Sequence, residues 1–228
     1  MYVQMTEIGG RRVLLRGDEK PAFLIIQPMD LHDPERVESL TKAMRESVEG
    51  PFLHCAVGVD DWNRDLSPWP APPVFGDAAF GDGAPDTLRY ITSSLLPALR
   101  ERFDLSETKV ILAGYSLAAL FALWAGYETD AFDGIAAASP SVWFNGWTDH
   151  AGSHEFRAKA ASLSLGSKEA KTRNQTMAKV ADCMEQQVDL IRNTPGRKVV
   201  FEWNPGNHFK DPDLRTAKAV AALTGLLK

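Results

Sequence analysis

The chain has 228 residues, of which 44% are hydrophobic and 24% are charged, a balance typical of a globular protein with a sizeable core. The formal net charge is −5 and there is no basic stripe, so nucleic acid is not expected as a partner. No segment approaches the ~18 apolar residues that span a bilayer, so a membrane protein is not expected either.

The start of the chain lacks the basic and apolar regions of a secretory signal. Cys55 falls in a strand-like segment and Cys183 in a helix-like one, so two reduced thiols are expected rather than a disulfide. These features predict a cytoplasmic protein. The length favours a single α/β domain over residues 1–228, with residues 1–17 leading into the sheet as a hairpin.

The predicted elements alternate between strands and helices. The hairpin pairs residues 2–8 with 11–15 around Gly9-Gly10, a dipeptide suited to the positive φ angles of a tight turn. Short apolar runs predict strands at 22–26, 52–59, 109–113, 134–138, 161–165 and 198–203. Helical periodicity and capping signals predict helices at 34–48, at 86–103 with an interruption at Pro97, at 171–191 and at 213–227. This alternation predicts an α/β fold with a mostly parallel central sheet covered by helices on both faces.

The stretch Gly114-Tyr115-Ser116-Leu117-Ala118 lies between an apolar strand-like run and an apolar helix-like run. This is the context of a nucleophile elbow, a tight strand-to-helix turn that exposes a serine hydroxyl. The residues two before and two after the serine must be small, and Gly114 and Ala118 meet that demand. Ser116 is therefore the candidate nucleophile, against the alternative of a buried serine in an ordinary turn.

A serine hydroxyl needs a base, usually a histidine that a carboxylate orients. His208 follows the last predicted strand, where the order serine, acid, histidine requires the base. His150 and His154 lie in a loop-like stretch and are expected at the surface. Glu169 follows a predicted strand end and is the candidate acid, with Glu155 as the alternative. Glu169 could also be a charge favoured by the N-terminus of a helix.

Backbone N–H groups should stabilise the oxyanion that develops during acyl transfer. One candidate donor is Leu117, directly after the nucleophile, and the other is Met29 or Asp30, of which Met29 is favoured. Aromatic residues crowd the predicted loops, and Trp69, Trp143 and Phe144 are the expected walls of a substrate pocket. They could equally be ordinary core residues.

Four segments together resemble the "putative esterase" group of α/β-hydrolases, which includes esterase D, the enterobactin (siderophore) esterases and the mycolyltransferases. They are Asn63–Pro68, Gly114–Ala118, Ser139–Trp143 and Asn204–His208. The resemblance extends from about Ala22 onward. It implies the α/β-hydrolase fold and a serine hydrolase that cleaves carboxylic esters of small molecules, without cofactor or metal.

In the resembling group the nucleophile maps to Ser116, the base to His208 and the acid to the region of Glu169. Two features depart from the group's pattern: Ala118 replaces the usual glycine, and Gln27-Pro-Met-Asp30 replaces His-Gly or Asp-Gly. Some siderophore esterases of the group use serine and histidine alone, so a dyad without Glu169 stays open. Two other functions also stay open: an acyltransferase of the same fold, and a binding protein that keeps the fold without catalysis.

Overall fold

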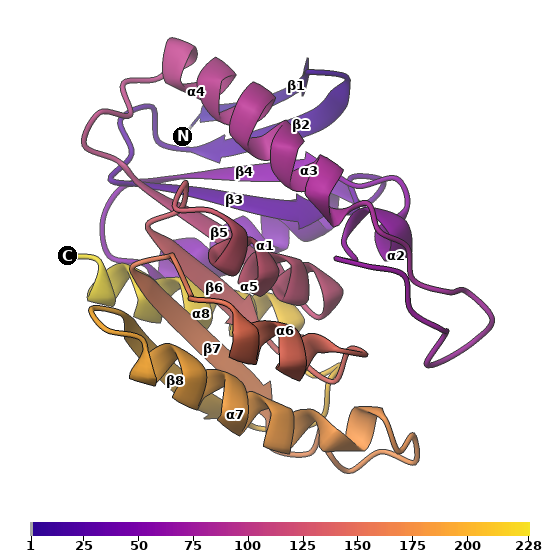
Figure 1. The fold of residues 1–228 in the computed structure, drawn as a ribbon. Coiled ribbons are helices and arrows are strands. Elements are labelled where there is room, and N and C mark those ends of the chain that lie inside the picture. Colours follow the sequence, from indigo (N-terminus) through magenta and orange to yellow (C-terminus); the bar gives the residue numbers. More distant parts are fainter. Residues whose placement is uncertain (1) are drawn as a thin grey trace.

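The computed structural model describes residues 2–228 and builds them around one eight-stranded sheet (Figure 1). The strands lie in the order β1-β2-β4-β3-β5-β6-β7-β8. Their bounds are β1 Tyr2–Ile8, β2 Arg11–Gly17, β3 Phe23–Met29, β4 Phe52–Gly58, β5 Lys109–Tyr115, β6 Gly134–Ala138, β7 Ala160–Gly166 and β8 Lys198–Asn204. β2 is antiparallel to both of its neighbours, and every other pairing is parallel.

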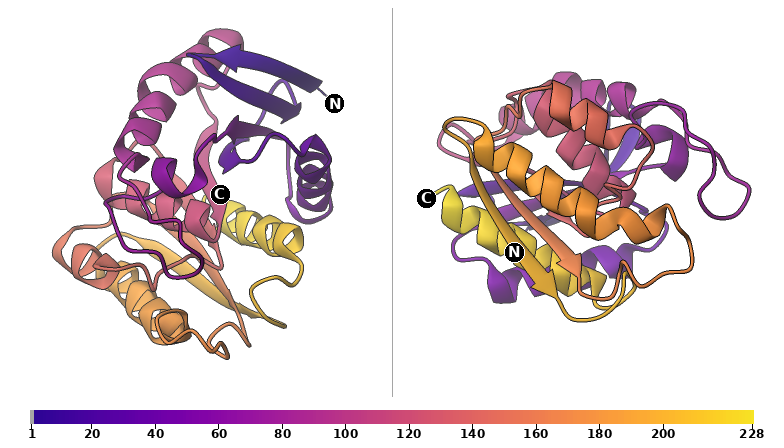
Figure 2. Two further views of the ribbon diagram at one scale, coloured as in Figure 1. Left: turned by 90° about the vertical axis from the view of Figure 1, so that its right-hand side faces the viewer. Right: turned by 60° about the horizontal axis from the view of Figure 1, so that its bottom comes forward.

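Helices cover the sheet in two layers (Figure 2). α1 and α8 pack on one face, where their apolar side chains form one core cluster with the strands. A larger cluster on the other face joins the strands to α3, α4, α5, α6 and α7. The helices are α1 Pro34–Ser47, α2 Trp62–Asp65, α3 Ala84–Tyr90, α4 Leu96–Arg102, α5 Leu117–Glu128, α6 Trp147–Ser153, α7 Val180–Asn193 and α8 Pro212–Leu226. The predicted parallel sheet with helices on both faces is confirmed.

Local sequence signals explain where several helices begin. Asp33 caps α1 by accepting the backbone N–H of Arg36 at 3.3 Å, and Pro34 occupies its first turn. α5 is buried from Leu117 to Tyr127 because it is apolar on all sides. α5 therefore lies in the core, with its N-terminus at the carboxyl end of β5.

The helix predicted at 86–103 contains a π-helical turn at Ile91–Leu95 rather than a break at Pro97. The N–H of Leu96 donates to the carbonyl of Ile91, five residues earlier. Pro97 has no N–H, so the helical hydrogen-bond ladder is interrupted at that point, and the wider turn keeps the chain helical through it.

The helix predicted at 171–191 begins only at Val180, after a short 3₁₀ turn at Met177–Lys179. The side chain of Asn174 explains the difference. Its Oδ1 accepts the N–H groups of Thr176 and Met177, and its Nδ2 donates to the carbonyl of Val74. Such side-chain bonds compete with helix formation and here tie the segment to a distant loop.

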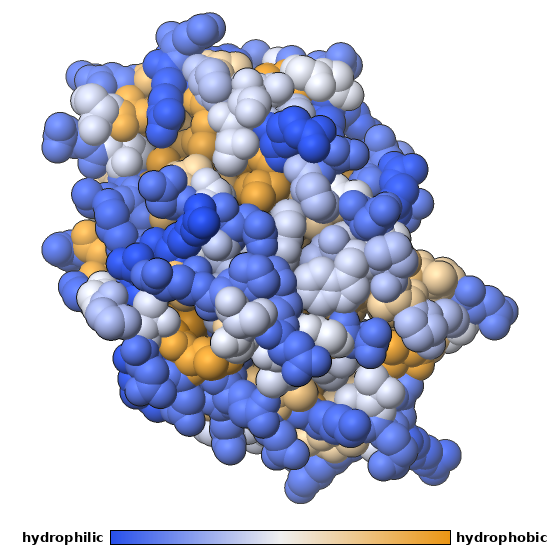
Figure 3. All heavy atoms as spheres, viewed as in Figure 1, coloured by the Kyte–Doolittle hydropathy of each residue, from blue (hydrophilic) through white to orange (hydrophobic). Residues whose placement is uncertain are grey.

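The face of the molecule seen in Figure 3 carries mostly hydrophilic residues, with hydrophobic residues in small separate groups. Over residues 2–228, no helix has the length and apolar character needed to cross a membrane.

Candidate active site

Ser116 lies in the sharp turn between β5 and α5. Its backbone has φ 58° and ψ −119°, a conformation that L-residues rarely adopt. Hydrogen bonds hold it there: its N–H donates to Ala138 at 3.2 Å, and its carbonyl accepts the N–H groups of Leu120 and Ser141. The strained turn points the hydroxyl out of the backbone at the head of a buried helix, as the elbow motif predicts.

Gly114 and Ala118 touch across this turn. A Cβ placed on Gly114 would lie 2.3 Å from the carbonyl carbon and oxygen of Ala118, well inside van der Waals contact. The strand and helix can therefore approach this closely only with glycine at position 114.

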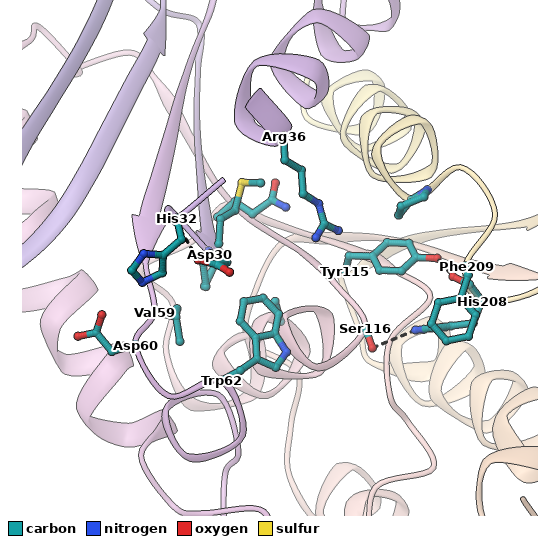
Figure 4. Close-up of a pocket in the computed structure, with 15 residues that line it drawn as sticks. Asp30, His32, Arg36, Val59, Asp60, Trp62, Tyr115, Ser116, His208 and Phe209 are labelled. Atoms are coloured by element: carbon teal, nitrogen blue, oxygen red, sulfur yellow. Dashed lines mark hydrogen bonds between the residues drawn. The ribbon is translucent and has the colours of Figure 1, made fainter. Parts of the chain in front are cut away.

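The three residues predicted as nucleophile, base and acid meet at the carboxyl ends of three strands. The Nε2 of His208 lies 3.1 Å from the Oγ of Ser116 (Figure 4). Its Nδ1 lies 2.7 Å from the Oε2 of Glu169. Glu169 follows β7 and His208 follows β8. With a carboxylate at Nδ1, that nitrogen carries the proton, which leaves Nε2 free to accept the serine hydroxyl.

The side chain of Glu169 is only 4% exposed, and its two carboxylate oxygens have different partners. Oε2 faces His208, while Oε1 accepts hydrogen bonds from the N–H of Gly166 at 2.6 Å, the Oγ of Ser139 at 2.7 Å and the Nη1 of Arg215 at 2.9 Å. Burial by itself raises the pKa of Glu169. The hydrogen bond and charge of His208, with the bonds from Ser139 and Gly166, outweigh burial and hold the pKa below its ordinary value.

The alternative residues lie elsewhere. Glu155 is exposed and lies 3.7 Å from Arg197, and His154 is exposed. His150, expected at the surface, is instead half-buried and packs against the rings of Trp69, Tyr127, Trp147 and His154. This burial lowers the pKa of His150 to about 4, so the residue is neutral at pH 7.

Ser116 and His208 open onto a cavity of about 520 Å³. It lies between the loops that follow β3, β4, β5 and β8, and its walls mix apolar and charged side chains (Figure 4). Its lining residues are Gln27, Pro28, Met29, Asp30, His32, Arg36, Val59, Asp60, Trp62, Tyr115, Ser116, Ala118, His208, Phe209 and Pro212.

The aromatic side chains of this cavity differ from those predicted. Trp69, Trp143 and Phe144 are absent from its lining. Trp143 and Phe144 pack on Phe80, and Trp69 packs on Phe144, with ring centroids 5.0 to 6.3 Å apart. These rings form an aromatic cluster of their own, in which Trp69 and Trp143 are partly buried. Trp62, Tyr115 and Phe209 supply the aromatic walls instead, and Trp62 and Phe209 lie on opposite sides of Ser116 in Figure 4. Their adjacency to the ends of β4, β5 and β8 was the signal available in the sequence.

Of the two backbone N–H donors expected near Ser116, the favoured candidate Met29 needs revision. The N–H of Leu117 opens α5 and donates to no group within residues 2–228, as expected for the first turn of a helix. The carbonyl of Met29 accepts the N–H of Val59 on the β4 side at 3.1 Å. Because the N–H and carbonyl of one strand residue point the same way, the N–H of Met29 faces β4 as well. The next N–H, that of Asp30, falls on the opposite side, and Asp30 lines the cavity.

Within residues 2–228, no three histidine, cysteine, aspartate or glutamate side chains gather into a group that could hold a metal ion.

Several solved structures share this fold. The siderophore hydrolase EstB from Aspergillus nidulans is 20% identical with a TM-score of 0.73, over 97% of this chain and 93% of that chain. EstA from the same organism is 19% identical with a TM-score of 0.75, over 100% and 94% of the two chains. The enterobactin hydrolase IroE, in complex with DFP, is 16% identical with a TM-score of 0.68, over 98% and 94%. The chain therefore has the α/β-hydrolase fold.

A comparison with curated protein sequences gave no match. The model of the family described as "Putative esterase" matches residues 52–211, which include the elbow, Glu169 and His208. That match covers more than half of the chain, and the resemblance in the sequence motifs points to the same group. The chain belongs to the "Putative esterase" family.

Proposed function

We propose that this protein is a serine esterase that hydrolyses carboxylic esters of small molecules through an acyl-enzyme intermediate. The observation that carries the proposal is the chain of hydrogen bonds from Ser116 through His208 to Glu169, at 3.1 and 2.7 Å. Its order along the chain, serine, acid and histidine, is that of α/β-hydrolases. A cavity of about 520 Å³ beside the serine is of a size that small-molecule sites have.

The reaction begins when the Nε2 of His208 takes the proton of the Ser116 hydroxyl. The oxygen then attacks the ester carbonyl carbon and forms a tetrahedral oxyanion. This intermediate collapses as His208 returns the proton to the leaving alcohol oxygen, and the acyl group stays on Ser116. Water then gives a proton to His208 and attacks the acyl carbon. The second tetrahedral intermediate collapses as His208 gives this proton to the oxygen of Ser116, which releases the carboxylic acid and restores the serine hydroxyl.

Glu169 supports both steps from the second ring nitrogen. Its lowered pKa keeps it ionised, so it accepts a hydrogen bond from the Nδ1–H of His208 and stabilises the imidazolium that forms. The backbone N–H groups of Leu117 and Asp30 are the donors we assign to the oxyanion. One such donor is typically worth ~3 kcal/mol of transition-state stabilisation.

The structural relatives support the ester class. EstA and EstB are described as siderophore hydrolases, and IroE is described as an enterobactin hydrolase. We therefore include a siderophore trilactone ester among the candidate substrates.

Ser116→Ala tests the proposal most directly. We expect wild type to hydrolyse p-nitrophenyl esters and to label rapidly with a fluorophosphonate, and the variant to lose ~10⁶-fold in kcat. The matched control is Ser153→Ala, an exposed serine in α6, which should stay within twofold of wild type.

Retention of more than a few per cent of the wild-type rate in purified Ser116→Ala would reject the nucleophile. Rapid labelling without hydrolysis, together with ester formation on an added alcohol, would indicate an acyltransferase instead. A wild-type protein that neither labels nor hydrolyses would indicate a binding protein.

A further inference from the structure

Arg215 is an arginine that the esterase mechanism does not use, and it is almost entirely enclosed. It lies in α8, and its side chain is 2% exposed. A guanidinium stays charged at any ordinary pH, and burying a charge is costly unless partners satisfy it. The partners of Arg215 therefore indicate what it holds.

The two terminal nitrogens of Arg215 reach different parts of the site. Nη1 donates to the Oε1 of Glu169 at 2.9 Å and to the Oγ of Ser139 at 3.2 Å. Nη2 donates to the carbonyl oxygens of Pro205 at 2.9 Å and Asn207 at 2.8 Å. These two carbonyls belong to the loop after β8 that carries His208.

We infer that Arg215 is a positioning residue that fixes the acid and the base of the site relative to each other through one rigid guanidinium. The inference rests on the proposed esterase function. One terminal nitrogen binds the carboxylate of Glu169 and the other binds the loop of His208. Because the guanidinium is planar and rigid, its geometry sets the distance between the acid and the base. The elbow joins the same network, because the hydroxyl of Tyr115 donates to the carbonyl of His208 and lies 3.4 Å from Nη1.

The sequence leaves space for this pair. A Cβ on Gly166 would lie 2.7 Å from the Oε1 of Glu169 and 2.8 Å from the Nη1 of Arg215. Only a residue without a side chain lets the carboxylate and guanidinium meet against the end of β7. The glycine at 166 and the arginine at 215 therefore belong to one arrangement.

Arg215 also acts through its charge. With three donors on Oε1, the carboxylate presents Oε2 to His208, and the nearby cation offsets part of its negative charge. Removal of the cation should leave that negative charge uncompensated and stabilise the protonated His208. The acid limb of the pH profile should then move to higher pH.

Two substitutions separate geometry from charge. Arg215→Lys keeps the cation but replaces the planar fork with one nitrogen, which cannot hold both the carboxylate and the loop in the same way. Arg215→Met removes the charge at similar length. Arg192→Lys is the matched control, because Arg192 is an exposed arginine paired with Asp189 in α7.

In Arg215→Lys we expect kcat for a p-nitrophenyl ester to fall at least tenfold, KM to stay within threefold and the acid limb to stay in place. Arg215→Met should lower kcat further and move the acid limb upward by half a pH unit or more. Arg192→Lys should match wild type. Because Arg215 acts through Glu169, adding Arg215→Met to Glu169→Gln should cost much less than adding it to wild type.

Wild-type kcat in Arg215→Lys would overturn the inference, as would an equal cost of Arg215→Met with and without Glu169→Gln. If Arg215→Met does not fold, as judged by circular dichroism, the lysine variant decides the question by itself. A wild-type protein without esterase activity or fluorophosphonate labelling would instead refute the proposed function. An active wild type with an equally active Arg215→Lys would refute only the role of Arg215.

Discussion

Ser116 and Glu169 have opposite environments that suit the roles we propose for them. Ser116 is partly exposed on the cavity wall in a strained backbone conformation, whereas Glu169 is buried and accepts four hydrogen bonds. His208 lies between them and is partly exposed. A proton can thus pass between serine and histidine at the cavity, while the acid stays shielded from water.

His208→Ala should be as damaging as Ser116→Ala, because nucleophile and base act as one unit. The expected loss is ~10⁶-fold in kcat, measured on a p-nitrophenyl ester. His154→Ala and His150→Ala are the controls, since both side chains lie outside the cavity lining. Strong loss in either control, combined with an active His208→Ala, would reassign the base.

Glu169→Gln should lower kcat by about 10⁴-fold, as loss of the third member does in other triads. The amide keeps the shape of the side chain but can present a donor to Nδ1, which disturbs the tautomer of His208. Glu155→Gln should remain within twofold of wild type, because Glu155 is exposed and its ion-pair partner is Arg197 rather than a residue of the site. A loss of only a few-fold in Glu169→Gln would support a serine–histidine dyad.

At the level of elements, the site depends on how closely β5 and α5 approach. Gly114 and Ala118 are in backbone contact there, and Ser116 takes its strained conformation between them. The surrounding hydrogen bonds to Ala138 and Ser141 connect the elbow to β6 and to the segment that follows it. The geometry of the nucleophile is therefore a property of two packed elements.

Gly114→Ala should push the helix away from the strand, since its Cβ would lie 2.3 Å from the backbone of Ala118. We expect a lower melting temperature, a destabilisation of ~1–3 kcal/mol or more, and loss of esterase activity. Gly152→Ala is the matched control, because no atom lies within 4 Å of its Cβ position in α6. Equal melting temperatures for the two variants would show that the elbow tolerates a side chain at 114.

On the scale of the whole molecule, buried histidines should make the protein sensitive to acid. His54 in β4 is fully buried, and its Nδ1 lies 2.9 Å from the Oγ1 of Thr41, whose own proton goes to Val37. The Nδ1 of His54 is therefore the donor, and its buried Nε2 has no partner within residues 2–228. Burial, with a smaller contribution from Arg16, lowers the pKa of His54 to about 4.

A lowered histidine pKa means that the unfolded chain binds the proton first. The free energy of unfolding should therefore reach its full value above about pH 6.5 and decrease as the pH falls toward 4. By pH 4, protonation of His54 should have lowered the free energy of unfolding by on the order of 3 kcal/mol. In urea unfolding, His54→Asn should flatten the pH dependence of the free energy of unfolding between pH 7 and 4.5, whether or not the substitution changes that free energy at pH 7. His32→Asn, at an exposed position, is the matched control. An unchanged slope in His54→Asn would mean that His54 does not titrate in this range.

Most of the fold could be predicted from the amino-acid sequence, because strong local patterns carry it. The apolar runs at 134–138 and 198–203 match β6 exactly and β8 to within a residue, and Asp33-Pro34 marks the start of α1. The candidates Ser116, Glu169 and His208 followed from their places at strand ends. The carboxyl ends of neighbouring parallel strands meet at one edge of a sheet, so chain order sufficed to bring them together.

Contacts between segments distant in sequence could not be predicted and became visible in the folded chain. Trp143 and Phe144 pack with Phe80, and Trp69 packs with Phe144, rather than around the cavity, because the path of the loops decides which rings meet. The direction of the Met29 N–H depends on its pairing with β4, and the start of α7 depends on a bond from Asn174 to a loop one hundred residues away. Arg215 lies in an ordinary helical sequence. Its partners lie on four other segments and become visible only when the chain is folded. Local sequence patterns show which face of an element is buried, but they do not show which segment packs against that face.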